Sequence, residues 1–183
     1  MRARLLLVGA AIIGLASWGT ARAETALELE YGVKAGYLPK FVPFITWPIG
    51  TFTSPSAPVN ICVLGPDLFG GKLDQDVAGL KAGDRWVAVR HLPEPDGEVS
   101  CQILFLGSGV DPAVVDGTLD AMKGQPVVTV TDTGVKSHGV ISFVIESNHV
   151  RFDIDDAAAA EDGLTISSKL LSLAHAVRLR GQP

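Results

Sequence analysis

The chain has 183 residues, of which 47% are hydrophobic and 19% charged, a composition typical of a globular protein. This apolar content argues against a disordered regulator. Beyond the N-terminus no apolar run approaches the roughly 18 residues of a membrane-spanning helix, which excludes a multi-pass membrane protein. The formal net charge of −5 argues against a broad electrostatic grip on nucleic acid. Two cysteines are too few for a disulfide scaffold or a four-thiolate zinc site.

The N-terminus has the order of a secretory signal peptide. Arg2 and Arg4 precede an apolar stretch, and the small residues around Ala21 and Ala23 fit a cleavage site. A retained membrane anchor is the alternative, but the apolar stretch 5–16 is shorter than the roughly 20 residues that a span needs. We therefore predict a signal peptide at 1–23 and a single exported, soluble domain at 24–183, with no membrane insertion after cleavage. That domain carries 12 basic and 20 acidic residues, a charge of −8, which disfavours anionic lipid and nucleic acid as partners.

The first element predicted in the mature chain is a helix between residues 24 and 47. Spacings of three and four place one stripe of residues on a common face: Leu27, Tyr31, Lys34/Ala35, Leu38 and Phe41/Val42. Pro39 and Pro43 lack an amide N–H and crowd the preceding turn, so we expect a break or kink near 38–42. The Thr/Ser/Pro-rich stretch 51–58 then predicts a loop.

Strands and helices alternate in the middle of the chain. Continuous apolar runs ended by turn residues predict buried strands at 59–64, 101–106 and 126–131. A further strand is expected at 86–92, with helices at 67–80 and 111–124. Such alternation implies parallel strands sandwiched between helices.

The pattern changes toward the C-terminus. Two strands, 140–146 and 149–154, flank Ser147-Asn148 and predict a hairpin. A short helix is expected at 155–161, and a longer helix at 167–180 with Leu170, Leu171, Ala174 and Val177 on one face. The predicted fold is therefore α/β, a mainly parallel sheet flanked by helices on both faces with an antiparallel edge hairpin, a Rossmann-like sandwich.

The sequence contains no motif that predicts catalysis, a metal or a cofactor. Gly107-Ser108-Gly109 follows a strand, but Pro112 and Leu106 stand where a dinucleotide fingerprint and a nucleophile elbow need glycine. The four histidines show no helical i, i+4 pair, although His138 and His149 could approach each other. The acids at 153–156 lack the glycine and glutamate of a calcium loop and fit the start of a helix better.

Cys62 and Cys101 each lie in an apolar run predicted to be a strand. If those strands are neighbours, a bridge is feasible when the Cα atoms lie within about 7 Å. A structural disulfide is the default interpretation in an oxidising compartment. Two inert buried thiols and a regulatory redox switch remain as alternatives.

Several motifs follow one another in a specific order and spacing. They are Glu30-Tyr31-x-x-Lys34-Ala35, Phe41-x-x-Phe44-x-x-Trp47-Pro48, Cys62-Val63-Leu64-Gly65, Phe69-Gly70, Cys101-x-Ile103-Leu104-Phe105, Pro126-Val127-x-Thr129-Val130-x-Asp132, Gly139-Val140-Ile141-x-Phe143, Val150-Arg151-Phe152-Asp153-Ile154 and Leu164-x-Ile166-Ser167-Ser168-x-Leu170-Leu171-x-Leu173-Ala174. Together they resemble the YfiR-like family of periplasmic regulators over roughly residues 28 to 179.

The resemblance implies a non-enzymatic protein of the periplasm. Members of this family repress an inner-membrane diguanylate cyclase by binding its periplasmic sensor domain, which lowers cyclic di-GMP and biofilm formation. The resemblance also implies an α/β sandwich, a homodimer, and a core disulfide where Cys62 and Cys101 stand. Family members can carry a second cysteine pair in the region of 136–143, and this chain has none there. Pro39 and Pro43 also depart from the family pattern, so partner choice could differ.

Two sets of residues are candidates for partner contact. The first set belongs to the first helix and its exit: Tyr37, Phe41 and Trp47. The second set lies off the aliphatic face of the predicted C-terminal helix, where a solvated surface is the alternative interpretation: Ser168, Lys169, His175 and Arg178.

A periplasmic small-ligand-binding module is the alternative function. Open α/β sheets hold ligands at the carboxyl ends of their strands. Gly65, Gly107 and Ser108 would line such a pocket.

Overall fold

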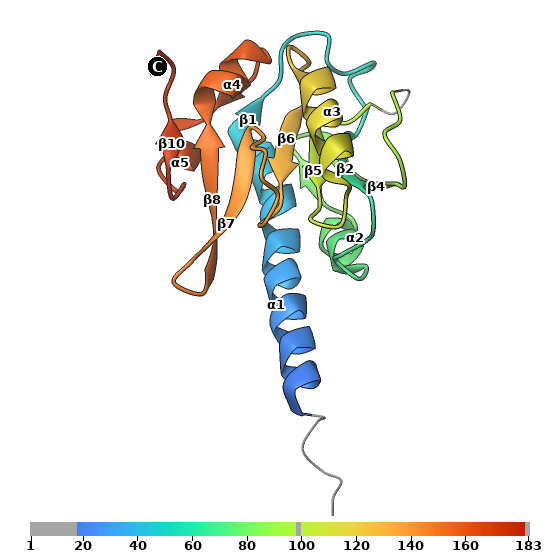
Figure 1. Ribbon diagram of the computed structural model, residues 1–183. Helices are drawn as coiled ribbons and strands as arrows, with labels where there is room; N and C mark the ends of the chain where they lie inside the picture. Colours follow the sequence, from blue (N-terminus) through green and yellow to red (C-terminus); the bar gives the residue numbers. More distant parts are fainter. Residues whose placement is uncertain (1–17, 98–99, 182–183) are drawn as a thin grey trace, which may run out of the picture.

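The computed structural model describes residues 18–97 and 100–181 (Figure 1). Of the predicted signal peptide, residues 1–17 lie outside this range, and 18–23 form the first turns of a long helix. Across the described residues, no helix has the length and apolar character needed to cross a membrane.

An eight-stranded, mostly parallel sheet forms the centre of the fold, in the order β10-β8-β7-β6-β5-β2-β4-β3. Its strands are β2 (Val59–Leu64), β3 (Lys81–Ala82), β4 (Arg85–Leu92), β5 (Ile103–Leu106), β6 (Val128–Thr131), β7 (Ile141–Glu146), β8 (His149–Asp155) and β10 (Val177–Arg178). A second, two-stranded antiparallel sheet joins β1 (Ile45–Thr46) to β9 (Thr165–Ile166). The predicted α/β class and all six predicted strands are confirmed, with ends shifted by up to two residues.

Helices cover both faces of the main sheet, because strand residues alternate between two cores. Ile61 and Ile103 face the larger core, which is closed by α1 (Trp18–Phe41) and α2 (Lys72–Val77). Leu64 and Leu106 face the opposite way, toward α3 (Pro112–Met122). The crossovers β2-α2-β4 and β5-α3-β6 therefore place their helices on opposite faces.

Helix α1 continues through Pro39 and ends at Phe41, inside the predicted window for a break. Pro39 lies in the last turn, so only one intrahelical hydrogen bond is lost there. Pro43 falls in the first turn of a 3₁₀ helix, η1 (Val42–Phe44), where an N–H is not needed. The residues of the predicted stripe lie on one face of α1 and are buried from Tyr31 to Val42, whereas Leu27 is 54% exposed. The N-terminal part of α1 extends past the sheet (Figure 1).

The predicted hairpin is confirmed, with Glu146 opposite His149. Ser147 and Asn148 have φ values of 50° and 62°, so both occupy the left-handed region that a two-residue type I′ turn requires. Asn tolerates this region because its short side chain bonds locally.

The predicted helix at 167–180 is wrong. Only α5 (Ser168–Leu171) is helical, and the chain then extends along β8 as β10. His175 Nδ1 lies 2.9 Å from a carboxylate oxygen of Asp153, and Arg178 and Arg180 pair with Asp155 and Asp156. Strand pairing and these ion pairs stabilise the extended conformation more than the helical spacing of the apolar residues stabilises a helix. The segment therefore forms β10, the outer strand next to β8.

The short helix predicted at 155–161 is confirmed as α4 (Asp156–Glu161). The Asp155 side chain accepts a hydrogen bond from the Ala158 N–H and caps the helix. The acids of this segment therefore do start a helix, as expected.

Candidate functional site

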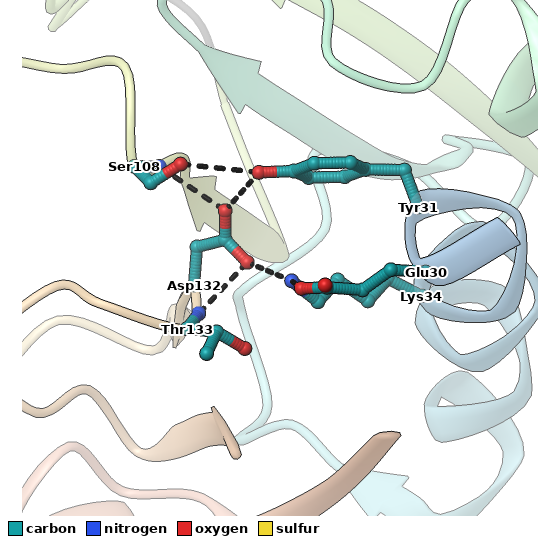
Figure 2. Close-up of polar contacts among 6 residues, drawn as sticks. All are labelled: Glu30, Tyr31, Lys34, Ser108, Asp132 and Thr133. Atoms are coloured by element: carbon teal, nitrogen blue, oxygen red, sulfur yellow. Dashed lines mark hydrogen bonds and ion pairs between the residues drawn. The ribbon is translucent and has the colours of Figure 1, made fainter. Parts of the chain in front are cut away.

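A buried polar cluster lies where α1 crosses the carboxyl ends of β5 and β6 (Figure 2). Helix α1 supplies Glu30, Tyr31 and Lys34, which share one face because residues three and four apart are neighbours on a helix. Lys34 is 0% exposed and Tyr31 is 5% exposed. A lysine is almost never fully buried unless it is paired, so its partner identifies the site.

That partner is Asp132, the residue after β6, which is 2% exposed. One carboxylate oxygen accepts hydrogen bonds from the Lys34 ammonium at 2.5 Å and the Thr133 N–H at 2.8 Å. The other accepts from the Tyr31 hydroxyl at 2.6 Å and the Ser108 N–H at 3.2 Å. Both oxygens are therefore fully used, and Asp132 joins α1 to the ends of two strands.

The cluster contains one ammonium group and two carboxylates, and the ammonium pairs with both. The Lys34 ammonium also donates to Glu30, whose side chain is 27% exposed and faces the edge of the cluster. Burial raises the pKa of Tyr31 above its usual range, and the hydrogen bond to Asp132 raises it further. Tyr31 therefore keeps its proton and acts as a donor.

This geometry anchors a helix and does not activate a nucleophile. The Ser108 hydroxyl lies 3.1 Å from the Tyr31 hydroxyl, and no histidine takes part in the cluster. Two surface grooves, one of about 1020 Å³ beside α3 and one of about 830 Å³ beside α1, are lined by other residues, so neither brings a substrate to the cluster. No group of histidine, cysteine and acidic residues suited to a metal occurs among residues 18–97 and 100–181.

The structure brings the three predicted ligand-contact residues to neighbouring strand ends, because β2 and β5 pair in parallel. A Cβ at Gly65 would lie 2.6 Å from Val110, and one at Gly107 would lie 3.1 Å from Leu68, so the chain itself fills much of this crevice. Ser108 belongs to the polar cluster. Of the three, only Gly65 lines the groove beside α3. Ligand binding at these residues stays a prediction.

The first set of predicted partner contacts divides between core and surface. Phe41 is 1% exposed and stacks among Tyr37, Phe143 and Phe152. Tyr37 is partly buried and lines the groove beside α1. Trp47 is partly buried against Phe52, and its indole nitrogen is buried without a hydrogen bond.

The second set lies at one border of the fold, in a different conformation from the predicted helix. Ser168 and Lys169 are exposed in α5, where the Lys169 ammonium lies 5.6 Å from the ring centre of Phe44. His175 and Arg178 are exposed but already paired with Asp153 and Asp155. Partner contact by either set stays a prediction.

Cys62 and Cys101 form a disulfide, with their Cα atoms 5.8 Å apart. Cys62 is fully buried in β2, and Cys101 precedes β5 on the face covered by α3. The bridge therefore joins neighbouring strands in the smaller core.

Sequence reasoning missed Asp132 and the burial of Lys34. Their signal was present in the motifs, since Lys34 stands on the apolar stripe of α1 and Asp132 directly follows a buried strand. The two residues are separated by 98 positions, so periodicity alone could not pair them.

Fold and cluster together define a class of protein: an α/β domain in which buried charged residues fix a helix on the sheet. The sequence pattern of the YfiR/HmsC-like family matches residues 31–175, and the chain belongs to this family. The family comprises periplasmic regulators of diguanylate cyclase signalling and is regulatory, not catalytic. No curated protein matches the chain.

Proposed function

We propose that the protein represses an inner-membrane diguanylate cyclase by binding the cyclase's periplasmic sensor domain, which lowers cyclic di-GMP and biofilm formation. The observation that carries this proposal is the family match across residues 31–175. The match includes Tyr31, Lys34, Ser108 and Asp132, which the fold assembles into one cluster. The anchor holds α1 in a fixed position on the sheet, which supports a role for the surface that α1 presents.

Binding, with no chemistry on a substrate, agrees with the geometry of the cluster. Its hydroxyl, ammonium and carboxylate groups satisfy one another and lie away from both grooves. The mature chain, with a predicted charge of −8, would approach its partner through local surface features, since a broad positive field is lacking.

The experiment is deletion of the gene, with measurement of cyclic di-GMP and surface attachment. Both should rise and should return to wild-type levels when the gene is restored. Capture from detergent-solubilised membranes with a tagged copy should recover a protein with a periplasmic domain and a diguanylate cyclase output domain. Unchanged cyclic di-GMP in a strain that contains such a cyclase would overturn the proposal.

The groove beside α3 favours a second candidate, a small-ligand-binding module. Its volume of about 1020 Å³ is at the upper end of ligand pockets, and its wall includes Gly65, Leu104 and Val127. A metabolite present at 100 times its dissociation constant adds about 2.7 kcal/mol to the free energy of unfolding. A thermal-shift screen of small apolar metabolites should therefore find a clear rise in Tm, and a flat screen would count against this candidate.

A further inference from the structure

A groove of about 830 Å³ runs between α1, α2 and β3. Its apolar part includes Val33, Tyr37 and Leu80. Val33 is 48% exposed, and Leu29, one turn earlier on the same side of α1, is 72% exposed. These two side chains add exposed apolar surface to α1 at the groove. In Figure 1 the N-terminal part of α1 extends beyond the sheet.

The rim of this groove is basic, although the protein as a whole is acidic. Lys40, Lys72 and Lys81 line it, against one acid, Asp76. Asp76 pairs with Lys72. Among the residues that the structure describes, no acid pairs with Lys40 or Lys81, and the Lys81 ammonium lies 4.2 Å from the ring centre of Trp86. Two positive charges therefore remain for an external acid, in a chain of net charge −5.

The wall of the groove on α1 contains two small residues. Gly32 and Gly36 lie in its wall, four residues apart on α1. A Cβ at Gly32 would meet nothing within 4 Å, and one at Gly36 would meet only the flexible end of Lys40 at 4.0 Å. Internal packing therefore does not require these glycines, although each costs about 1 kcal/mol relative to alanine inside a helix. They let a second backbone approach α1 closely.

We infer that this groove binds an amphipathic helix of the partner, with small or apolar residues facing α1 and acidic residues against Lys40 and Lys81. The inference rests on the proposed function, in which the partner is the periplasmic domain of a membrane cyclase. Charge favours this occupant over a second copy. Two copies of this chain, each with a net charge of −5, repel each other, whereas an acidic helix of another protein complements the lysines of the rim.

The first test reverses the charge of the two lysines that have no acidic partner. The double variant Lys40→Glu with Lys81→Glu is made in the full-length protein, expressed from its own locus. Capture of the cyclase from solubilised membranes should fall at least tenfold, and cyclic di-GMP should rise to the level of the deletion strain. The matched control, Lys136→Glu with Arg151→Glu, changes the net charge equally at exposed positions outside the groove and should leave both readouts at wild type.

The second test needs no change of charge. A photo-crosslinking amino acid is placed at Val33 and, as a control, at Lys136, and adducts are mapped by mass spectrometry. The expected product joins position 33 to a helical segment rich in Asp and Glu in the cyclase's periplasmic domain, and it should disappear when Lys40 and Lys81 are reversed.

The outcomes separate the inference from the proposed function. If deletion leaves cyclic di-GMP unchanged, the proposed function fails. If the Lys40→Glu, Lys81→Glu variant represses the cyclase as well as wild type does, the groove is not the contact surface and the inference fails. An adduct to lipid, to a second copy of this chain or to no molecule at Val33 also overturns the inference.

Discussion

Helices α1 and α3 lie on opposite faces of one sheet and are held to it by different kinds of interaction. Helix α3 packs its own Val115 against aliphatic side chains of the sheet, among them Leu104 and Leu106, beside the Cys62–Cys101 bridge. Helix α1 also has an apolar face, but at its centre Lys34 and Tyr31 bond to Asp132. Apolar contacts are non-directional and tolerate exchange between residues of similar size. A buried ion pair requires every partner, because a single charge left alone is strongly unfavourable.

The largest expected effect comes from Asp132→Asn, which keeps the shape of the side chain and removes its charge. Lys34 would then be buried with only the partly exposed Glu30 as a counter-charge. We expect the free energy of unfolding to fall by about 3–5 kcal/mol, measured by urea denaturation.

Two control substitutions separate the loss of a buried charge from other changes of side chain. Leu106→Met, a similar exchange of shape on the α3 face, should cost less than about 1.5 kcal/mol. Asp120→Asn removes an exposed carboxylate paired with Lys123 and should leave the free energy of unfolding almost unchanged, because solvent screens an exposed ion pair. If Asp132→Asn were no worse than Leu106→Met, the contrast between the two faces would be mistaken.

The next largest effect is expected from removal of the disulfide by Cys62→Ser with Cys101→Ser. The bridge closes a loop across 39 residues of sequence separation. Its loss should lower the free energy of unfolding by roughly 2–4 kcal/mol, mainly because the unfolded chain gains freedom. Urea denaturation of the oxidised protein and the double variant measures it.

The same variant tests whether the two faces are independent. When the cysteine substitutions are combined with Asp132→Asn, the total loss in free energy of unfolding should equal the sum of the two separate losses to within about 0.5 kcal/mol. A larger deviation would show that the α3 face and the anchor of α1 are energetically coupled.

The smallest of the three effects is that of Tyr31→Phe, about 2 kcal/mol for a hydrogen bond to a charged group. The Tyr31 hydroxyl also makes the free energy of unfolding depend on pH. Burial and Asp132 raise the pKa of Tyr31 in the folded state, whereas in the unfolded chain tyrosine loses its proton near pH 10. The unfolded state then binds fewer protons, so the free energy of unfolding falls as pH rises above about 10 and is unaffected below.

Two measurements follow from that sign. Phenolate absorbance should show one of the two tyrosines titrating only with alkaline unfolding, and Tyr31→Phe should remove this late step. The variant should also flatten the alkaline loss of stability. Two ordinary phenolate titrations in the wild-type protein would contradict the buried donor.

The contrast between the faces also explains what the sequence could predict. Strands β2, β5 and β6 were recognisable because buried parallel strands are continuous apolar runs. The C-terminal helix failed because Leu170, Leu171, Ala174 and Val177 have helical spacing, while pairing with the acids near β8 decides the conformation. The apolar stripe of α1 was predicted. Its anchor was not, since Lys34 and Asp132 meet only in the folded chain.

The two strands at the borders of the main sheet have a consequence for self-association. β3 and β10 contain two residues each, Lys81–Ala82 and Val177–Arg178. The two borders differ in how much of the adjoining strand they cover. The chain before and within β10 bonds to Phe152 and Ile154 of β8, whereas β3 pairs with only Arg85 and Trp86 of β4. The ion pairs of Arg178 and Arg180 hold the outer strand in place. Edge-to-edge growth into fibrils is therefore hindered at the border of β8, where the outer position is occupied, and less so along β4.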